Sequence, residues 1–241
     1  MKRDIEEQKF LDKYDPSAFP PIAVAVDAVV FGISRSAPDN YRKLGKQSLN
    51  ILLIRRSEYP FKNKLSLPGG FVLPNETIDE TAKRVLKAKT GLDKIYCEQL
   101  YTFGDINRDP RMRVISCAYI ALVDTEKTRI IDAEWVRLDM IKNEELAFDH
   151  AAIITEALKR LRGKINYTDI VFHMMPETFT ISQLQEIYQT VLEKELLPAA
   201  FRRTIAHKIT QTEKFTHNAG HRPSRLYRWN GADGDISVDN R

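Results

Sequence analysis

Runs of apolar residues in the first half of the chain follow the spacing of β-strands. Residues 22–33, rich in Val and Ala, predict a buried strand, and residues 49–56 predict a second one. The polar, Pro-containing stretch between them suits a hairpin with a long loop. Further strands are predicted over residues 95–103, 113–123 and 133–136.

Helical spacing occurs at three places in the same region. Residues 78–89 predict a helix, because Thr77 and Glu80 form a capping box and Gly91 stands where a helix ends. A short helix is predicted over residues 4–13, and an amphipathic one over residues 151–161 that closes with Gly163. Strands interrupted by two substantial helices predict an α+β or α/β sandwich over about the first 160 residues.

The pattern changes after Gly163. A second capping box at Thr180 starts an amphipathic helix that ends near Lys194, and Pro198 begins another helix that we expect to run through Ile209. Two strand-like segments follow, at residues 214–217 and 225–229. A helix, a short turn, a second helix and a hairpin are the order of a winged helix-turn-helix. We therefore expect one domain over residues 1–163, a second over 164–232, and a disordered tail over 233–241.

Composition places the protein among ordinary globular chains. Of its 241 residues 43% are hydrophobic and 29% are charged, which excludes collagen-like and disordered classes. No apolar run has the roughly 20 residues of a membrane span, and the acidic start does not resemble a signal peptide. We expect a soluble, cytoplasmic protein. Its two cysteines, Cys97 and Cys117, are interpreted as reduced core residues.

The excess positive charge is confined to one C-terminal stretch. Residues 198–230 contain seven Lys or Arg and a single acid, Glu213, in a chain whose net charge is +4. Such a stretch is typical of a protein that binds a polyanion, most often nucleic acid, although a solvated basic face without a partner is a common alternative.

The second helix of the C-terminal region has the residues that suit a DNA major groove. If Phe201, Ile205 and Ile209 form its buried stripe, Arg203 and His207 lie on the opposite face, where an Arg can pair with guanine. Lys208 falls nearer the core, and Tyr227 and Trp229 are expected to pack the hairpin. The predicted DNA-binding residues are Thr180, Ser182, Ala199, Arg202, Arg203, His207, Arg222, Arg225 and Arg228.

A motif in the N-terminal region resembles the Nudix box. The matching residues are Gly70, Glu76, Arg84, Leu86, Gly91 and Leu92, in frame and without a gap. The resemblance implies the Nudix fold, and its catalysis depends on carboxylates at the positions held here by Val85, Ala88 and Lys89. A hard cation needs anionic oxygen ligands, and this face supplies none. We therefore expect no enzyme activity, no catalytic residue, no metal and no cofactor.

A site that lacks catalysis can still bind a ligand. Arg55 and Arg56 end one predicted strand, and the loop from Arg108 to Arg113 carries three further arginines. Guanidinium groups can hold a diphosphate by bidentate contacts without a metal. The predicted ligand-binding residues are Arg55, Arg56, Gly70, Phe71, Arg108, Asp109, Arg111 and Arg113.

A Nudix domain followed by a winged helix is similar to the family of Nudix-related transcriptional regulators, known best from NAD metabolism. The resemblance implies an α+β chain with an N-terminal Nudix α/β/α sandwich and a C-terminal winged helix-turn-helix. It also implies a homodimeric repressor that binds a palindromic DNA operator and is released by ADP-ribose or a related nucleotide. Two alternatives remain: a Nudix pyrophosphatase that acts on ADP-ribose with acids recruited from elsewhere, and a regulator that responds to a pentose.

Overall fold

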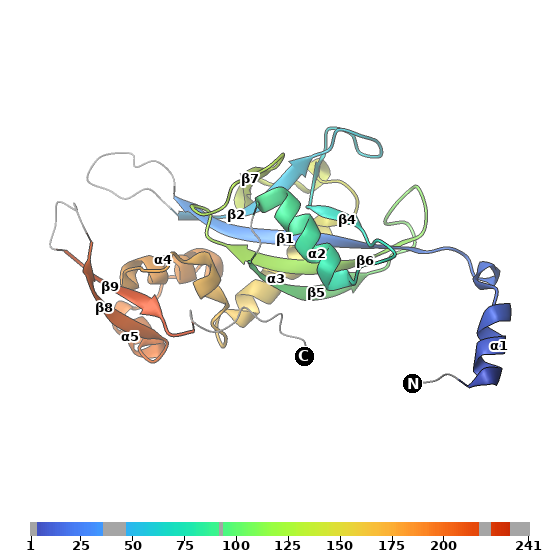
Figure 1. Ribbon diagram of the computed structural model, residues 1–241. Coiled ribbons are helices and arrows are strands. Elements are labelled where there is room, and N and C mark those ends of the chain that lie inside the picture. The colour runs from blue at the N-terminus through green and yellow to red at the C-terminus, as the bar shows by residue number, and fades with distance from the viewer. Residues whose placement is uncertain (1–3, 36–46, 92–93, 217–222, 232–241) are drawn as a thin grey trace.

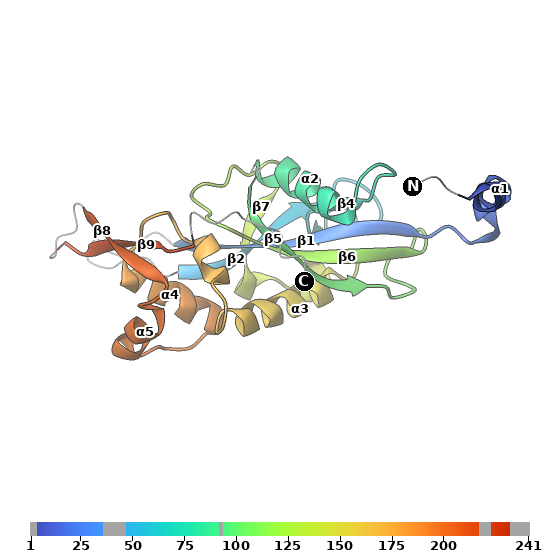
Figure 2. The ribbon, with the colours of Figure 1, turned by 60° about the horizontal axis from the view of Figure 1, so that its bottom comes forward.

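The computed structural model describes residues 4–35, 47–91, 94–216 and 223–231. It has an α/β/α sandwich followed by a small helical domain with a two-stranded wing, which confirms the expected fold class (Figures 1 and 2). Arg222 and the expected disordered tail lie outside the described residues. Among the described residues, no helix is long and apolar enough to cross a membrane.

The sheet is built around one long strand. β1 (Ala23–Arg35) pairs in parallel with β6 (Val114–Val123) on one side and antiparallel with β2 (Gln47–Arg55) and β4 (Gly69–Phe71) on the other. The remaining strands, at the margins, are β3 (Leu65–Ser66), β5 (Tyr96–Phe103) and β7 (Glu134–Arg137). The antiparallel pairing of β1 with β2 confirms the long-looped hairpin predicted from the sequence.

Two helices cover opposite faces of this sheet. α2 (Ile78–Thr90) lies on one face and α3 (His150–Lys164) on the other, as the second view shows (Figure 2). Each face of the sheet packs against its helix in a hydrophobic core, and alternate residues of β1 point into the two cores. Ala28 and Val30 pack on the α2 side, and Val29 and Phe31 on the α3 side. α2 begins at the predicted Thr77 capping box and ends at Gly91, whose φ of 69° favours glycine.

The C-terminal domain has the predicted order of elements. α4 (Ile181–Leu192) starts at the Thr180 capping box, and α5 (Pro198–Ile205) follows after a short turn. β8 (Ile209–Phe215) and β9 (Arg225–Trp229) form the wing hairpin. Three-residue 3-10 turns occur at Pro16–Ala18 (η1), Leu138–Met140 (η2) and Asn143–Glu145 (η3), and a longer one, η4 (Ile170–Met174), precedes α4.

Two predicted helix ends are wrong. α3 continues through Gly163 to Lys164, because Gly163 keeps a helical conformation instead of closing the helix. α5 ends at Ile205, and Ile209 is the first residue of β8, paired with Trp229. His207 therefore lies in the turn after α5, where its backbone oxygen accepts a hydrogen bond from Asn230, and not on the helix face predicted for it.

The two domains share one hydrophobic core. The cluster under α3 continues through η4 into α4 and α5, so that Val171, Phe179 and Leu184 belong to the same buried group as Ile120 of β6. Trp229 stacks on Phe172 with ring planes 2° apart. The connection between the domains is thus packed against the sheet and is not a loose tether.

An N-terminal segment stands apart from both domains. α1 (Ile5–Lys13) has no buried residue, and it lies well away from the sheet in both ribbon views (Figures 1 and 2). Asp4 caps it by accepting a hydrogen bond from the backbone of Glu6.

Candidate functional site

A cavity of about 420 Å³ opens at the end of the sheet where β1 begins. Its size falls in the usual range for a small-molecule site. Seven of the eight predicted ligand residues line it: Arg55, Arg56, Gly70, Phe71, Arg108, Asp109 and Arg111. Arg113 does not; its guanidinium donates to the backbone oxygen of Asp105 at 2.7 Å.

Arg108 forms part of the floor of this cavity. Its guanidinium donates to Asp27 at 3.0 Å and makes a bidentate contact with Asp149 at 3.0 and 2.8 Å. The side chain is only 4% exposed. The contacts of Nε and one terminal nitrogen with two carboxylates position the loop that carries Arg108, and its role as a phosphate ligand stays a prediction.

Asp27 is the centre of this buried network. Besides Arg108, it accepts a hydrogen bond from the Ser116 hydroxyl at 2.6 Å and lies 3.6 Å from Nε2 of His150. Burial alone would raise the pKa of Asp27, but His150, Ser116 and Arg108 outweigh it and hold that pKa at about 2. Sequence reasoning assigned no site role to Asp27 or His150, which lie far apart in the chain.

Arginines and aromatic rings form the rim. The Arg111 guanidinium lies 5.7 Å from the Phe71 ring centre and 5.9 Å from that of Phe148, and Arg56 lies 4.9 Å from Phe148. Arg111 is 46% exposed and pairs with the buried Asp109. Positive groups beside exposed aromatic faces can hold a phosphate and a flat ring together. Phe148 was not among the predicted ligand-binding residues.

The Nudix-box residues have a structural role. Glu76 accepts a bidentate pair from Arg84 at 2.9 and 2.6 Å and a backbone hydrogen bond from Leu73 at 2.9 Å. These contacts, the Arg84 hydrogen bond first, lower the pKa of Glu76 to about 2. Arg84 also donates to the backbone oxygen of Phe71. The pair therefore fixes the loop beside the cavity.

Val85, Ala88 and Lys89 stand at the three α2 positions where Nudix catalysis depends on carboxylates. Val85 is buried under Gly70, Ala88 is exposed, and Lys89 reaches the cavity wall. Among the described residues, no cluster of three or more His, Cys, Asp or Glu side chains could hold a metal ion.

The winged helix presents its basic residues to solvent. Arg202 and Arg203 are exposed on α5, with Ala199 beside them, while Phe201 and Ile205 are buried beneath. Arg225 and Arg228 are exposed on β9, and Arg225 stacks over Phe215 at 5.0 Å. Ser182 is exposed in the first turn of α4, whereas the Thr180 hydroxyl serves as the helix cap. Lys208 is tied to Asp169 at 2.7 Å.

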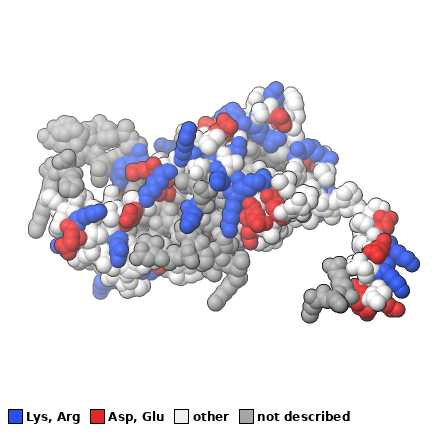
Figure 3. Space-filling model, in the orientation of Figure 1, with Lys and Arg blue, Asp and Glu red and all other residues white. Residues whose placement is uncertain are grey.

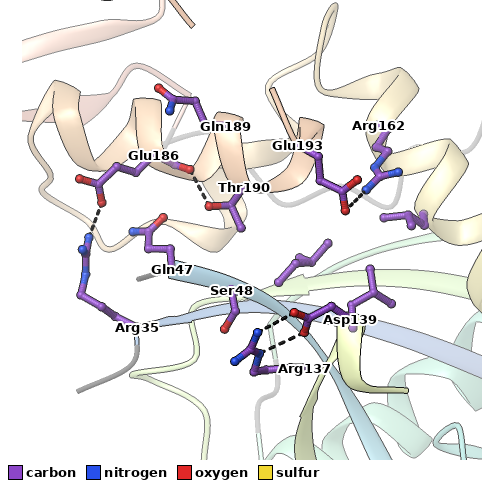
Figure 4. A pocket seen from close by; sticks show the side chains of 13 residues that line it. Arg35, Gln47, Ser48, Arg137, Asp139, Arg162, Glu186, Gln189, Thr190 and Glu193 are labelled. Carbon is purple, nitrogen blue, oxygen red and sulfur yellow. Dashed lines mark hydrogen bonds and ion pairs between the residues drawn. The ribbon is translucent and has the colours of Figure 1, made fainter. Parts of the chain in front are cut away.

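A larger cavity of about 740 Å³ lies at the junction of the domains (Figure 4). Arg35 of β1 reaches Glu186 of α4 at 2.5 Å, and Arg162 of α3 reaches Glu193 at 2.6 Å. Arg137 pairs with Asp139 on its wall. Because each arginine is matched by an acid, this cavity offers no net charge for an anion. The smaller cavity, with its exposed arginines, is the better candidate for a charged ligand.

Two family models match the chain. The NUDIX domain matches residues 36–157, and the NrtR DNA-binding winged helix domain matches residues 171–229. This chain belongs to the NrtR family of Nudix-related transcriptional regulators. The domain limits expected from the sequence are compatible with these ranges but stay a prediction.

The chain is similar to three proteins of known name. The "ADPR responsive transcriptional repressor NtrR" of Acinetobacter baylyi is 35% identical over 240 residues, covering 96% of this chain and 91% of its own. NrtR of Shewanella oneidensis, solved with a 27mer DNA, has 30% identity and a TM-score of 0.72, with 86% and 93% covered. Its Nudix domain was solved with ADP ribose, at 34% identity and a TM-score of 0.53, with 64% and 98% covered. An ADP-ribose pyrophosphatase of Methanocaldococcus jannaschii is 34% identical over 163 residues, covering 67% of this chain and 86% of its own.

Proposed function

We propose that this protein is a transcriptional repressor whose Nudix domain senses ADP-ribose and whose winged helix binds operator DNA. The observation that carries the proposal is the pairing of two sites in one chain: a ligand cavity rimmed by Arg56, Arg111 and Phe148, and a winged helix with exposed arginines on α5 and β9. The relatives named for these two ligands support both halves of it.

The cavity suits a nucleoside diphosphate sugar in chemical terms. Arg55 is 60% exposed and Arg111 46% exposed, so both side chains can turn toward a diphosphate. The rings of Phe71 and Phe148 provide faces on which a base can stack. Two acids of the cavity, Asp27 and Asp109, are already paired with arginines, so they do not repel an anion as free carboxylates would, and the third, Glu58, is exposed.

The ligand acts as a signal and not as a substrate in this proposal. Val85, Ala88 and Lys89 replace the carboxylates on which Nudix hydrolysis depends, and Lys89 adds a positive charge on the cavity wall. A sensor that hydrolysed its effector would report the concentration of that effector poorly. The alternative, an ADP-ribose pyrophosphatase like the Methanocaldococcus relative, requires acids from elsewhere in the chain.

The deciding experiment measures binding and release together. An operator would first be selected from random duplex DNA with the purified full chain, and its affinity then measured by fluorescence anisotropy at fixed salt. ADP-ribose should bind and release the DNA, whereas AMP and free pentose, as matched controls, should not. Release by pentose alone would favour the sugar-responsive alternative, and formation of AMP from ADP-ribose at enzyme-like rates would favour the pyrophosphatase.

A further inference from the structure

Lys89 stands at an α2 position where Nudix catalysis depends on a carboxylate, and it was not among the predicted ligand-binding residues. It follows Val85 by one helical turn, so the two side chains lie on the same face of the helix. Val85 packs against β4, since a Cβ on Gly70 would lie 3.2 Å from its Cγ2. Gly70 and Lys89 both line the ligand cavity, and Lys89 is half-buried. The lysine therefore belongs to the ligand site by its position.

The acids at the start of α2 are engaged by groups other than Lys89. Glu76, the acid of the Nudix box, accepts two hydrogen bonds from Arg84. Asp79 accepts a hydrogen bond from the hydroxyl group of Tyr119. Over the described residues, the ion pairs do not include Lys89. Its ammonium group therefore keeps its charge for a ligand.

The arginines of the same cavity differ from Lys89 in this respect. Arg55, Arg108 and Arg111 each pair with a carboxylate of the protein. An anionic ligand competes with that carboxylate at each arginine, but no such competition occurs at Lys89. Figure 3 shows several Lys and Arg side chains over the face that α2 covers in Figure 1, beside a smaller group of acids.

The chemistry of this wall differs from that of a Nudix hydrolase, in which carboxylates hold a divalent cation at the pyrophosphate. Val85 and Ala88 bring no anionic oxygen, and Lys89 repels a cation, so a divalent metal does not fit this face of α2. An ammonium group attracts the same phosphate oxygens and donates up to three hydrogen bonds to them. Unlike a metal ion, it does not lower the pKa of a bound water to make a nucleophile.

We propose that the ammonium group of Lys89 takes the place of the divalent cation at the diphosphate of the effector, so that the effector binds without a metal. The inference rests on the proposed function, in which this effector is ADP-ribose. One residue then accounts for two properties of the site. Its charge retains the attraction for the diphosphate, and the same charge keeps out the cation on which Nudix hydrolysis depends.

Isothermal titration calorimetry of the full chain with ADP-ribose tests this, in one buffer with EDTA and in another with excess Mg²⁺. Lys89→Met keeps the length of the side chain without its charge, and Lys89→Arg keeps the charge. Lys83→Met is the matched control, because Lys83 is exposed on the same helix and its loss changes the net charge equally. Thermal unfolding of each variant verifies that it is folded.

The unchanged protein is expected to bind ADP-ribose equally well in both buffers. Lys89→Met should bind it about 10- to 100-fold more weakly, the usual effect of losing a hydrogen bond to a charged group. Lys83→Met and Lys89→Arg should stay close to the unchanged protein.

A double variant, Ala88→Glu with Lys89→Glu, reverses the charge of this wall. It should bind ADP-ribose weakly in EDTA and regain affinity in Mg²⁺, because two carboxylates can then hold the cation beside the diphosphate.

The proposal would be overturned by equal affinities of Lys89→Met and Lys83→Met, or by a Lys89→Arg variant as weak as Lys89→Met. A requirement for Mg²⁺ in the unchanged protein, or a double variant indifferent to Mg²⁺, would also overturn it. Each of these results leaves ADP-ribose as the effector. Failure of the unchanged protein to bind ADP-ribose in either buffer would instead refute the proposed function, and this proposal with it.

Discussion

Arg162 and Glu193 join the sensor domain to the DNA-binding domain. Arg162, in the last turn of α3, pairs with Glu193 at 2.6 Å and donates through Nε to the backbone oxygen of Val191 at 2.9 Å, at the end of α4. The other end of α3 carries His150, whose Nδ1 accepts the backbone hydrogen bond of Leu67 in the wall of the ligand cavity. One helix therefore contacts both the ligand cavity and the DNA-binding domain.

We expect Arg162→Gln to weaken the response to the effector. Binding of ADP-ribose should be unchanged, since Arg162 lies far along α3 from the cavity residues. A typical coupling shifts DNA affinity by about 5- to 150-fold, and loss of the pair should remove most of that shift. The measurement is the ratio of DNA dissociation constants with and without ADP-ribose. Lys159→Gln is the control, because Lys159 lies on the same helix and its ion pair with Glu156 is local to that helix.

If Arg162→Gln and Lys159→Gln responded equally well, α3 would not be the route of coupling. The next candidate would be β1, which runs from Asp27 in the cavity to Arg35, the partner of Glu186 on α4.

No turnover of ADP-ribose is expected with Mg²⁺ or Mn²⁺. The reason is the identity of Val85, Ala88 and Lys89, which offer no anionic oxygen to a cation. The measurement is AMP release in a single-turnover assay, where an enzyme of ordinary efficiency would react at about 1 per second or faster. Glu at all three positions should create at least weak Mn²⁺ binding, measurable by titration. Turnover by the unchanged protein would contradict the sensor.

Two arginines of the winged helix should differ in what they do for DNA binding. Arg203→Ala, on the exposed face of α5, should cost about 1 to 3 kcal/mol per half-site for the operator and relax the preference at one base pair. Arg225→Ala, on the wing, should weaken all sequences alike and lower the salt slope by about one. Equal losses on operator and random DNA for both variants would remove α5 from direct readout.

Acid is expected to loosen the junction of the domains through His173. Its ring stacks on Tyr96 of β5 at 4.4 Å and meets Trp229 of β9 edge-on at 5.2 Å. Burial lowers the pKa of His173 from 6.5 to about 4. The unfolded chain therefore takes up a proton at higher pH than the folded one, and stability falls as the pH decreases from 6.5 to 4, by up to about 3 kcal/mol.

His173→Phe keeps an aromatic ring against Tyr96 but has no nitrogen that can take up a proton. Its melting temperature should decline less than that of the unchanged protein over this pH interval. Identical pH profiles for the two proteins would show that His173 does not control the acid sensitivity.

The sequence predicted the elements well where the pattern was local. The capping boxes at Thr77 and Thr180 marked helix starts, because a cap involves residues only three apart. The predicted end of α5 was wrong because the contact that places Ile209 in a strand is not local in the sequence. Phe201, Ile205 and Ile209 are evenly spaced, and the pattern could not reveal that Ile209 pairs with Trp229 across a hairpin.

The sequence predicted which residues line the cavity but not which residues they contact. The arginines were visible in the sequence, and seven of the eight predicted ligand residues do line one cavity. The structural role of Arg108 was not visible, because its partners Asp27 and Asp149 lie 81 and 41 positions away. Contacts between such distant residues depend on how the strands are ordered, which no local pattern encodes.

The core that runs unbroken from the sheet through η4 into α4 constrains how this gene can recombine. A crossover between the two domain-coding halves would place β6 from one parent against Val171 and Phe172 from another. Side chains of different size would then meet in a close-packed interior, where a volume change of even one methylene group affects stability. Viable hybrids of related regulators should therefore inherit β6 and η4 from the same parent, with their breakpoints elsewhere in the chain.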